Sequence, residues 1–143
     1  MISTVLIDAG PLIALFDRDD KYHHRVRAFL EDYECRFVST LAVLTEVSYM
    51  LNFSVHAQID FLEWILRGGI RLEDIRRDDI ARIITLVQKY HDVPMDFADA
   101  TLVAAAEKTG IRSIISLDSD FDIYRLPGKV RIHNIFSFDD YHA

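Results

Sequence analysis

The alternation of short apolar runs with longer amphipathic stretches constrains the fold of this chain more than any other feature. The runs that favour strands are residues 3–7, 37–38, 70–72, 113–117 and 129–133. The stretches with helical spacing of apolar residues are 11–16, 21–33, 41–52, 55–66, 78–90 and 96–108. Because most of the strands are separated by helices, the sequence predicts an α/β fold with a parallel five-stranded sheet and helices on both faces, a three-layer α/β/α domain.

The length and the residue usage limit the classes of protein to consider. A chain of 143 residues can bury one good core, so we expect a single domain over residues 1–143. Polar residues interrupt every apolar stretch well before the roughly 20 residues that cross a bilayer, and the N-terminus lacks the basic start of a secretory signal. The single cysteine, Cys35, allows no internal disulfide and no zinc finger. We therefore expect a cytoplasmic protein with no membrane partner.

Charge and motifs exclude several functions. The net charge of −7 is not typical of a protein that binds nucleic acid through a broad basic surface. It is compatible with a nuclease, since bound divalent cations would neutralise acids gathered in one pocket. The chain contains no phosphate-binding glycine loop of either common type and no G-x-S-x-G nucleophile motif.

Two acidic positions follow strands. Asp8 directly follows the first predicted strand and Asp118 directly follows the fourth. In open α/β sheets, ligands bind beyond the carboxyl ends of the strands, so both acids are candidate site residues. Each has a simpler alternative role as a helix or turn cap. Asp120 and Asp122 lie close to Asp118 and are alternatives to it, and Asp118 is preferred because it directly ends the strand.

Glu46 is the third candidate because its helical neighbours are apolar. Ala42, Val43, Tyr49 and Met50 stand one turn before and after it. A carboxylate buried on such a face would cost several kcal/mol without a cation or a paired base. The alternative is that this helix is partly exposed and that Glu46 reaches water.

Asp99 is the fourth candidate, and it repeats this pattern on a later helix. Three of its neighbours on the helical face are Met95, Leu102 and Val103, and the fourth is Asp96. Two acids one turn apart repel each other. The alternative is that Asp96 caps the helix and Asp99 is a first-turn acid favoured by the helix dipole.

A parallel sheet would gather these four acids at one edge. Oxygen ligands of this kind suit Mg²⁺ or Mn²⁺. Divalent ions held by carboxylates can activate water and stabilise the charge on phosphoryl oxygens. The acids therefore predict metal-dependent hydrolysis of phosphodiester bonds.

The same residues carry a resemblance to a known family. The segments that carry it are VLIDAGPLIALFD with Asp8, LAVLTEVSYML with Glu46, PMDFADATLVAAA with Asp99 and IISLDSDF with Asp118. Their order and spacing resemble the PIN-domain nucleases, and most closely the VapC-type toxins of bacterial toxin–antitoxin pairs. The resemblance covers essentially the whole chain.

The resemblance implies roles for individual residues. Asp8, Asp99 and Asp118 correspond to the metal-binding acids of the family, and Glu46 to the acid that completes the catalytic site. Ser116 stands where the family often has a Thr, whose hydroxyl can hold the last acid or a metal-bound water.

Two positions fit the family pattern less well. Ala9 follows the first acid, where many relatives carry Ser or Thr, and Asp96 is less regular in the family.

The resemblance also implies an activity and partners. It implies the same three-layer fold, dependence on Mg²⁺ or Mn²⁺, an endoribonuclease acting on an RNA substrate, and a protein antitoxin. The bulky apolar residues of the stretch 41–66 exceed what one sheet face needs, so they indicate a homodimer interface or a groove for an antitoxin. The alternatives are that this stretch is ordinary core, and that the protein is a non-catalytic PIN-fold binding module with a structural acid cluster.

Overall fold

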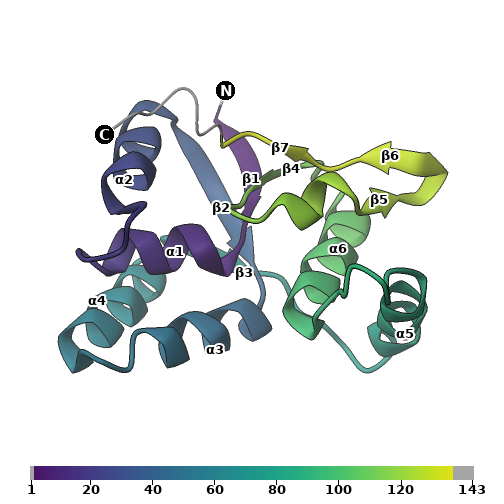
Figure 1. Ribbon diagram of the computed structural model, residues 1–143, viewed down its shortest axis with the longest axis horizontal. Coiled ribbons are helices and arrows are strands. Elements are labelled where there is room, and N and C mark those ends of the chain that lie inside the picture. The colour runs from purple at the N-terminus through teal and green to yellow at the C-terminus, as the bar shows by residue number, and fades with distance from the viewer. Residues whose placement is uncertain (1, 137–143) are drawn as a thin grey trace.

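The computed structural model describes residues 2–136, and residues 1 and 137–143 of the predicted domain lie outside the described residues. A five-stranded parallel sheet with the strand order β3-β2-β1-β4-β7 runs through the centre (Figure 1). Its strands are β1 (Ser3–Ile7), β2 (Cys35–Ser39), β3 (Ile70–Leu72), β4 (Ser113–Ile115) and β7 (His133–Asn134). The predicted parallel sheet is therefore confirmed.

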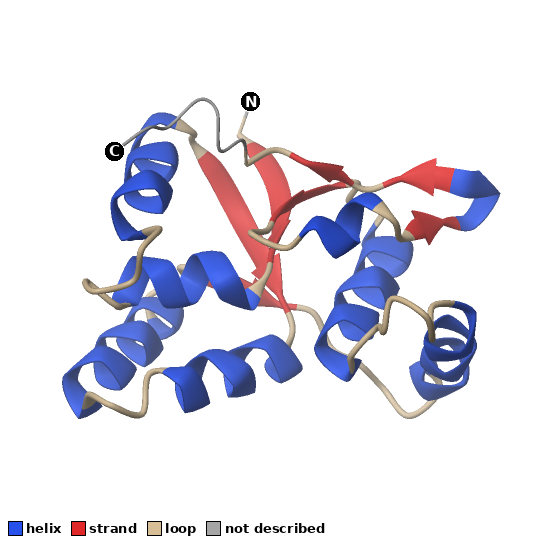
Figure 2. Cartoon of the chain, in the orientation of Figure 1, coloured by secondary structure: helices blue, strands red, loops and turns tan. Residues whose placement is uncertain are grey.

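Helices cover both faces of the sheet. They are α1 (Ala9–Phe16), α2 (His23–Asp32), α3 (Leu41–Met50), α4 (Val55–Leu66), α5 (Asp79–Lys89) and α6 (Phe97–Thr109). Helices α1 to α4 lie on one side of the strands and α5 and α6 on the other (Figure 2). The three-layer arrangement predicted from the sequence is confirmed. Among residues 2–136, no helix has the length and apolar character needed to span a bilayer.

The strand order reverses direction between β1 and β4. From β1 the chain moves outward through β2 to β3, and it later returns to place β4 on the other edge of β1. The two strands pair at Leu6 with Ile114 and at Ile7 with Ile115, and the Asp8 N–H donates to the Ile115 carbonyl at 3.1 Å. Such a reversal leaves a crevice at the carboxyl ends of the strands, which is where α/β folds bind ligands.

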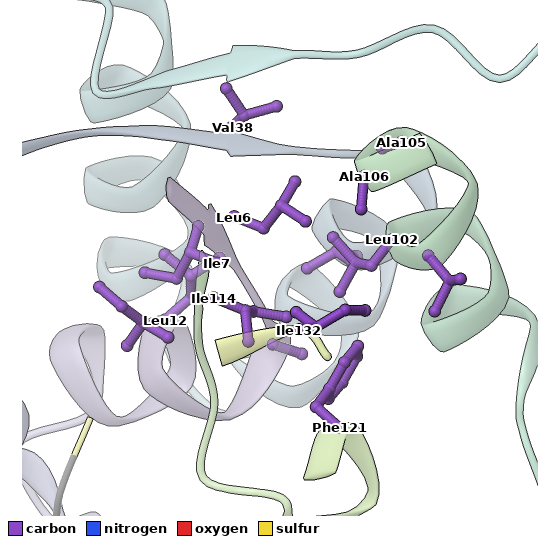
Figure 3. Packing of buried hydrophobic residues seen from close by; sticks show 14 of the residues in the cluster. Leu6, Ile7, Leu12, Val38, Leu102, Ala105, Ala106, Ile114, Phe121 and Ile132 are labelled. Atoms are coloured by element: carbon purple, nitrogen blue, oxygen red, sulfur yellow. The ribbon is translucent and has the colours of Figure 1, made fainter. Parts of the chain in front are cut away.

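The core forms between the sheet and α6. Leu6, Ile7 and Ile114 from the central strands are fully buried, and Leu102 of α6 packs toward them (Figure 3). Residues 104–106 of α6 are all alanine and all buried, so this helix can approach the sheet closely. The packing fixes the first turn of α6, which carries Asp99, against the edge of the sheet.

The last predicted strand, 129–133, is wrong in its bounds. Val130–Arg131 forms β6, which pairs antiparallel with β5 (Arg125–Leu126) in a separate hairpin, and only His133–Asn134 joins the main sheet. The hairpin turns through Gly128 and Lys129, which both have positive φ angles, 77° and 61°. The predicted run itself is interrupted at Ile132, so that β6 pairs with β5 while β7 pairs with β4 in the main sheet.

The side chain of Asn134, the last residue of β7, bonds the backbone of Ser116 just beyond the end of β4. Its side-chain Nδ2 donates to the Ser116 carbonyl at 3.0 Å, and its Oδ1 accepts from the Ser116 N–H at 3.2 Å. The same Oδ1 accepts from the Phe136 N–H at 3.2 Å. Because Ser116 is fully buried, the Asn134 amide satisfies backbone groups that water cannot reach.

Asn134→Ala should lower the free energy of unfolding by about 1–3 kcal/mol, because it leaves the buried Ser116 N–H and carbonyl without partners. Urea denaturation monitored by circular dichroism measures this change. The exposed Asn52 provides a matched control, and Asn52→Ala should change the free energy by less than about 0.5 kcal/mol. Equal effects of the two substitutions would show that the Asn134 bridge does not stabilise the sheet.

Candidate active site

The four predicted acids line one pocket at the carboxyl edge of the sheet. Asp8, Glu46, Asp99 and Asp118 all border a cavity of about 220 Å³, and Asp96 borders it as well. These residues come from the end of β1, from α3, from the start of α6 and from the segment after β4. The structure therefore brings together side chains that are up to 110 positions apart in the sequence.

Asp8 is buried and held by two donors. Its side chain is the N-cap of α1, with Oδ1 accepting from the Ala9 N–H at 2.8 Å and Oδ2 from the Ser116 hydroxyl at 3.0 Å. The pKa of Asp8 is raised to about 6, chiefly by burial and also by the charges of Glu46 and Asp118, while the hydrogen bonds from Ala9 and Ser116 lower it. Asp8 therefore combines the predicted capping role with a place in the acidic pocket.

The close approach of chain segments around Asp8 depends on Gly10. A Cβ atom at this position would lie 3.3 Å from the Cβ of Leu117, which is tighter than most such contacts. The absence of a side chain lets α1 begin against the segment that leads to Asp118.

Asp99 lies in the first turn of α6 and is also buried. Its N–H donates to Oδ1 of Asp96 at 2.7 Å, so Asp96 is the N-cap, as the sequence analysis allowed. The hydroxyl of Tyr124 donates to Oδ2 of Asp99 at 2.8 Å. Burial raises the pKa of Asp99 to about 8, with the charge of Asp8 as the second cause.

Asp118 and Asp120 both belong to the acidic cluster. Asp118 caps the short helix η1 (Ser119–Asp122) by accepting from the Asp120 N–H at 2.9 Å, and its own N–H donates to Ser116 Oγ at 2.9 Å. One carboxylate oxygen from each of Asp99, Asp118 and Asp120 lies within 4.8 Å of the others. The group does not include Asp122. Of the alternatives left open, Asp120 thus accompanies Asp118 rather than replacing it.

The expected burial of Glu46 is wrong, although its place at the pocket is not. Glu46 is exposed, and its helical neighbours Tyr49 and Met50 are 70% and 50% exposed. Only a narrow face of α3, with Val43 and Val47, enters the core. Partial burial of the carboxyl group, followed by the charge of Asp96, raises its pKa. Glu46 therefore reaches the pocket from its solvent side.

Two residues of the site were not predicted from the sequence. Tyr124 is fully buried and bonds Asp99, and Asn134 holds the backbone of Ser116. Each contact joins residues that are distant in sequence or lie in different elements, and neither residue type is unusual at its position. No pattern in the sequence distinguishes Tyr124 from an ordinary core aromatic residue.

The donor set fits a hard divalent cation. The pocket offers several carboxylates and no sulfur or imidazole ligand among its lining residues. Such an oxygen set suits Mg²⁺ or Mn²⁺. Burial raises the pKa values of both Asp8 and Asp99, so ionising them in the folded protein is unfavourable, and a bound cation would offset that cost.

The chain matches a family model and a curated protein over most of its length. The family model of the PIN domain matches residues 5–126. The curated protein Ribonuclease VapC26 of Mycobacterium tuberculosis is 27% identical over 116 residues, which cover 80% of this chain and 86% of that protein.

Solved structures share the fold. The crystal structure of Mycobacterium tuberculosis VapC20, described as a Sarcin-Ricin loop cleaving toxin, matches with a TM-score of 0.75 and 21% identity over 83% of this chain and 93% of that one. A toxin–antitoxin complex from Klebsiella pneumoniae matches with a TM-score of 0.61 and 22% identity over 92% and 99% of the two chains. VapBC2 from Rickettsia felis, bound to a promoter DNA fragment, matches with a TM-score of 0.60 and 11% identity over 92% and 98%. With the family model matching most of its length, this chain belongs to the PIN domain family.

Proposed function

We propose that this protein is a metal-dependent endoribonuclease that uses Mg²⁺ or Mn²⁺, and that it is the toxin of a toxin–antitoxin pair. The observation that carries the proposal is the convergence of Asp8, Glu46, Asp99 and Asp118 on one pocket. The name of the related Ribonuclease VapC26 supports RNA as the substrate.

The residues of this site have different proposed roles. Asp99, Asp118 and Asp120 would hold a cation through oxygens that already lie close together, and Asp8 would complete the set. When bound, the cation supplies an activated water and neutralises charge on the phosphate. Glu46 has a raised pKa and access to solvent, and it would serve as the proton acceptor of the site.

Asp99→Asn should lower RNA cleavage by about 100-fold or more, because it removes a carboxylate from the cation site. The loss is measured with a fluorescently labelled RNA in Mn²⁺ buffer, with an EDTA-treated sample expected to be inactive. Asp122→Asn is the matched control, since Asp122 is an exposed neighbouring acid outside the group. Wild-type cleavage in excess EDTA would contradict the proposal and favour a non-catalytic PIN-fold binding module.

The metal-free protein should become less stable as the pH rises from about 4 to about 8. Asp8 and Asp99 have folded-state pKa values of about 6 and about 8 against 3.8, so the folded state binds more protons than the unfolded state in this window. Each group can contribute a slope of up to about 1.4 kcal/mol per pH unit.

The measurement is thermal or urea unfolding at several pH values with EDTA present. Asp99→Asn should flatten the upper part of the decline, and added Mn²⁺ should restore stability at pH 8. If Asp99→Asn has the same pH dependence of stability as the wild type, the raised pKa of Asp99 does not cause the decline.

The hollow between α1, α2 and α4 is the surface we assign to the antitoxin. It has a volume of about 810 Å³ and places Phe16 and Trp64 beside Arg18, His24 and Arg27. Further exposed apolar side chains lie on α3, on α4 and in the turn between them, at Tyr49, Phe53, Val55, Ile59, Leu62 and Leu66. The combination favours a peptide segment that carries both apolar and acidic residues.

A different apolar face, on α5, is the surface we assign to a homodimer. Ile80, Ile84 and Val87 follow one another at helical spacing and are 39%, 53% and 38% exposed. The neighbouring hollow of about 500 Å³ carries charges of both signs, including Asp74 and Arg77. A face with both signs can pair with its own copy across a two-fold axis.

Ile84→Glu should convert the dimer into a monomer, because it places a charge in the centre of the apolar contact. Light scattering coupled to size-exclusion chromatography should give 16.5 kDa for the variant and twice that mass for the wild type. Ile59→Glu on α4 is the matched control and should remain dimeric. The opposite result, with only Ile59→Glu dissociating, would show that the α3–α4 surface forms the dimer.

A further inference from the structure

Tyr124 makes the one side-chain hydrogen bond that Asp99 receives from the described residues. The phenol oxygen donates to Asp99 Oδ2 at 2.8 Å, and both residues are buried. The other carboxylate oxygen, Oδ1, accepts no hydrogen bond within residues 2–136. The contact therefore occupies one oxygen of the acid and leaves the other without a hydrogen bond from the described residues.

The ring of Tyr124 is fixed by its neighbours. It meets the ring of Phe121 edge-on at 5.2 Å between centroids and the ring of Tyr90 at 5.0 Å. The hydroxyl of Tyr90 accepts the Arg125 N–H at 2.8 Å, which holds the backbone directly after Tyr124. With the ring and its backbone both held, the phenol can point its hydroxyl in one direction only.

We propose that Tyr124 is a positioning residue that orients the Asp99 carboxylate for cation binding. The inference rests on the proposed function, because it presumes that Asp99 holds a cation. A buried phenol needs an acceptor, and here the acceptor is one of three acids whose oxygens lie within 4.8 Å of one another. Groups that orient a metal ligand from behind affect metal affinity by about 10- to 100-fold when they are removed.

Tyr124→Phe removes only the hydroxyl and keeps the ring. The expected result is a rise of about 10-fold or more in the Kd for Mn²⁺, measured by electron paramagnetic resonance of the free ion. Tyr33→Phe is the matched control, because its ring stacks on Phe29 after α2 and Tyr33 is not among the residues that line the acidic pocket. Its Kd should stay within about twofold of the wild type, even where its melting temperature falls. A Kd for Tyr124→Phe within twofold of the wild type, or equal shifts in both variants, would overturn the inference.

A second measurement avoids any loss of folding in the variants. 3-Fluorotyrosine is placed at position 124, or at position 90, of the full chain and followed by ¹⁹F NMR during Mg²⁺ titration. The signal at position 124 should shift on saturation, and the signal at position 90 should shift much less. An unmoved signal at position 124 would overturn the proposed role.

Asp99→Asn separates this inference from the function on which it rests. If Asp99→Asn binds Mn²⁺ as tightly as the wild type, Asp99 does not hold a cation, and both the proposed function and the role of Tyr124 are overturned. Loss of binding in Asp99→Asn, with unchanged binding in Tyr124→Phe, would leave the site in place and overturn only the role of Tyr124.

Discussion

Asp8 and Asp99 are two buried carboxylates held at the same edge of the sheet. Burial disfavours the ionisation of both, and the charge of Asp8 further disfavours that of Asp99. The packed core holds the backbone that carries these two acids, and hydrogen-bond donors hold their carboxylate groups. Ser116 bonds Asp8, Tyr124 bonds Asp99, and Asn134 holds the backbone of Ser116. The neighbourhood is thus arranged around charge that the protein alone does not neutralise, which is typical of sites that recruit a cation.

Much of the fold and of the site could be predicted because it depends on local pattern and on one topological rule. Short aliphatic runs such as Ser3–Ile7 mark buried strands, and parallel strands end together. An acid placed directly after such a strand, as Asp8 is, must therefore lie at the ligand-binding edge. The same reasoning placed Asp118 there. Asp99 was singled out by the apolar neighbours on its helix, and the capping role of Asp96 followed from helix chemistry.

The failures have a common physical cause, which is that tertiary partners decide burial. Apolar neighbours suggested that Glu46 is buried, but Tyr49 and Met50 remain exposed because α3 presents only a narrow face to the core. The run 129–133 is divided at Ile132 because its two halves pair with different strands, which its residues alone do not reveal. The contact between Tyr124 and Asp99 joins different elements, and single-sequence patterns carry no information about such pairs.

The strand order determines how late in translation the acidic pocket can form. One edge of β1 is covered by β4, whose first residue is synthesised 110 positions after Ser3. Until β4 emerges, the chain holds Asp8, Glu46 and Asp99 without Asp118, and the central strand lacks one neighbour. The acidic pocket that we assign to a cation therefore stays incomplete until β4 and Asp118 have been synthesised and β4 has paired with β1.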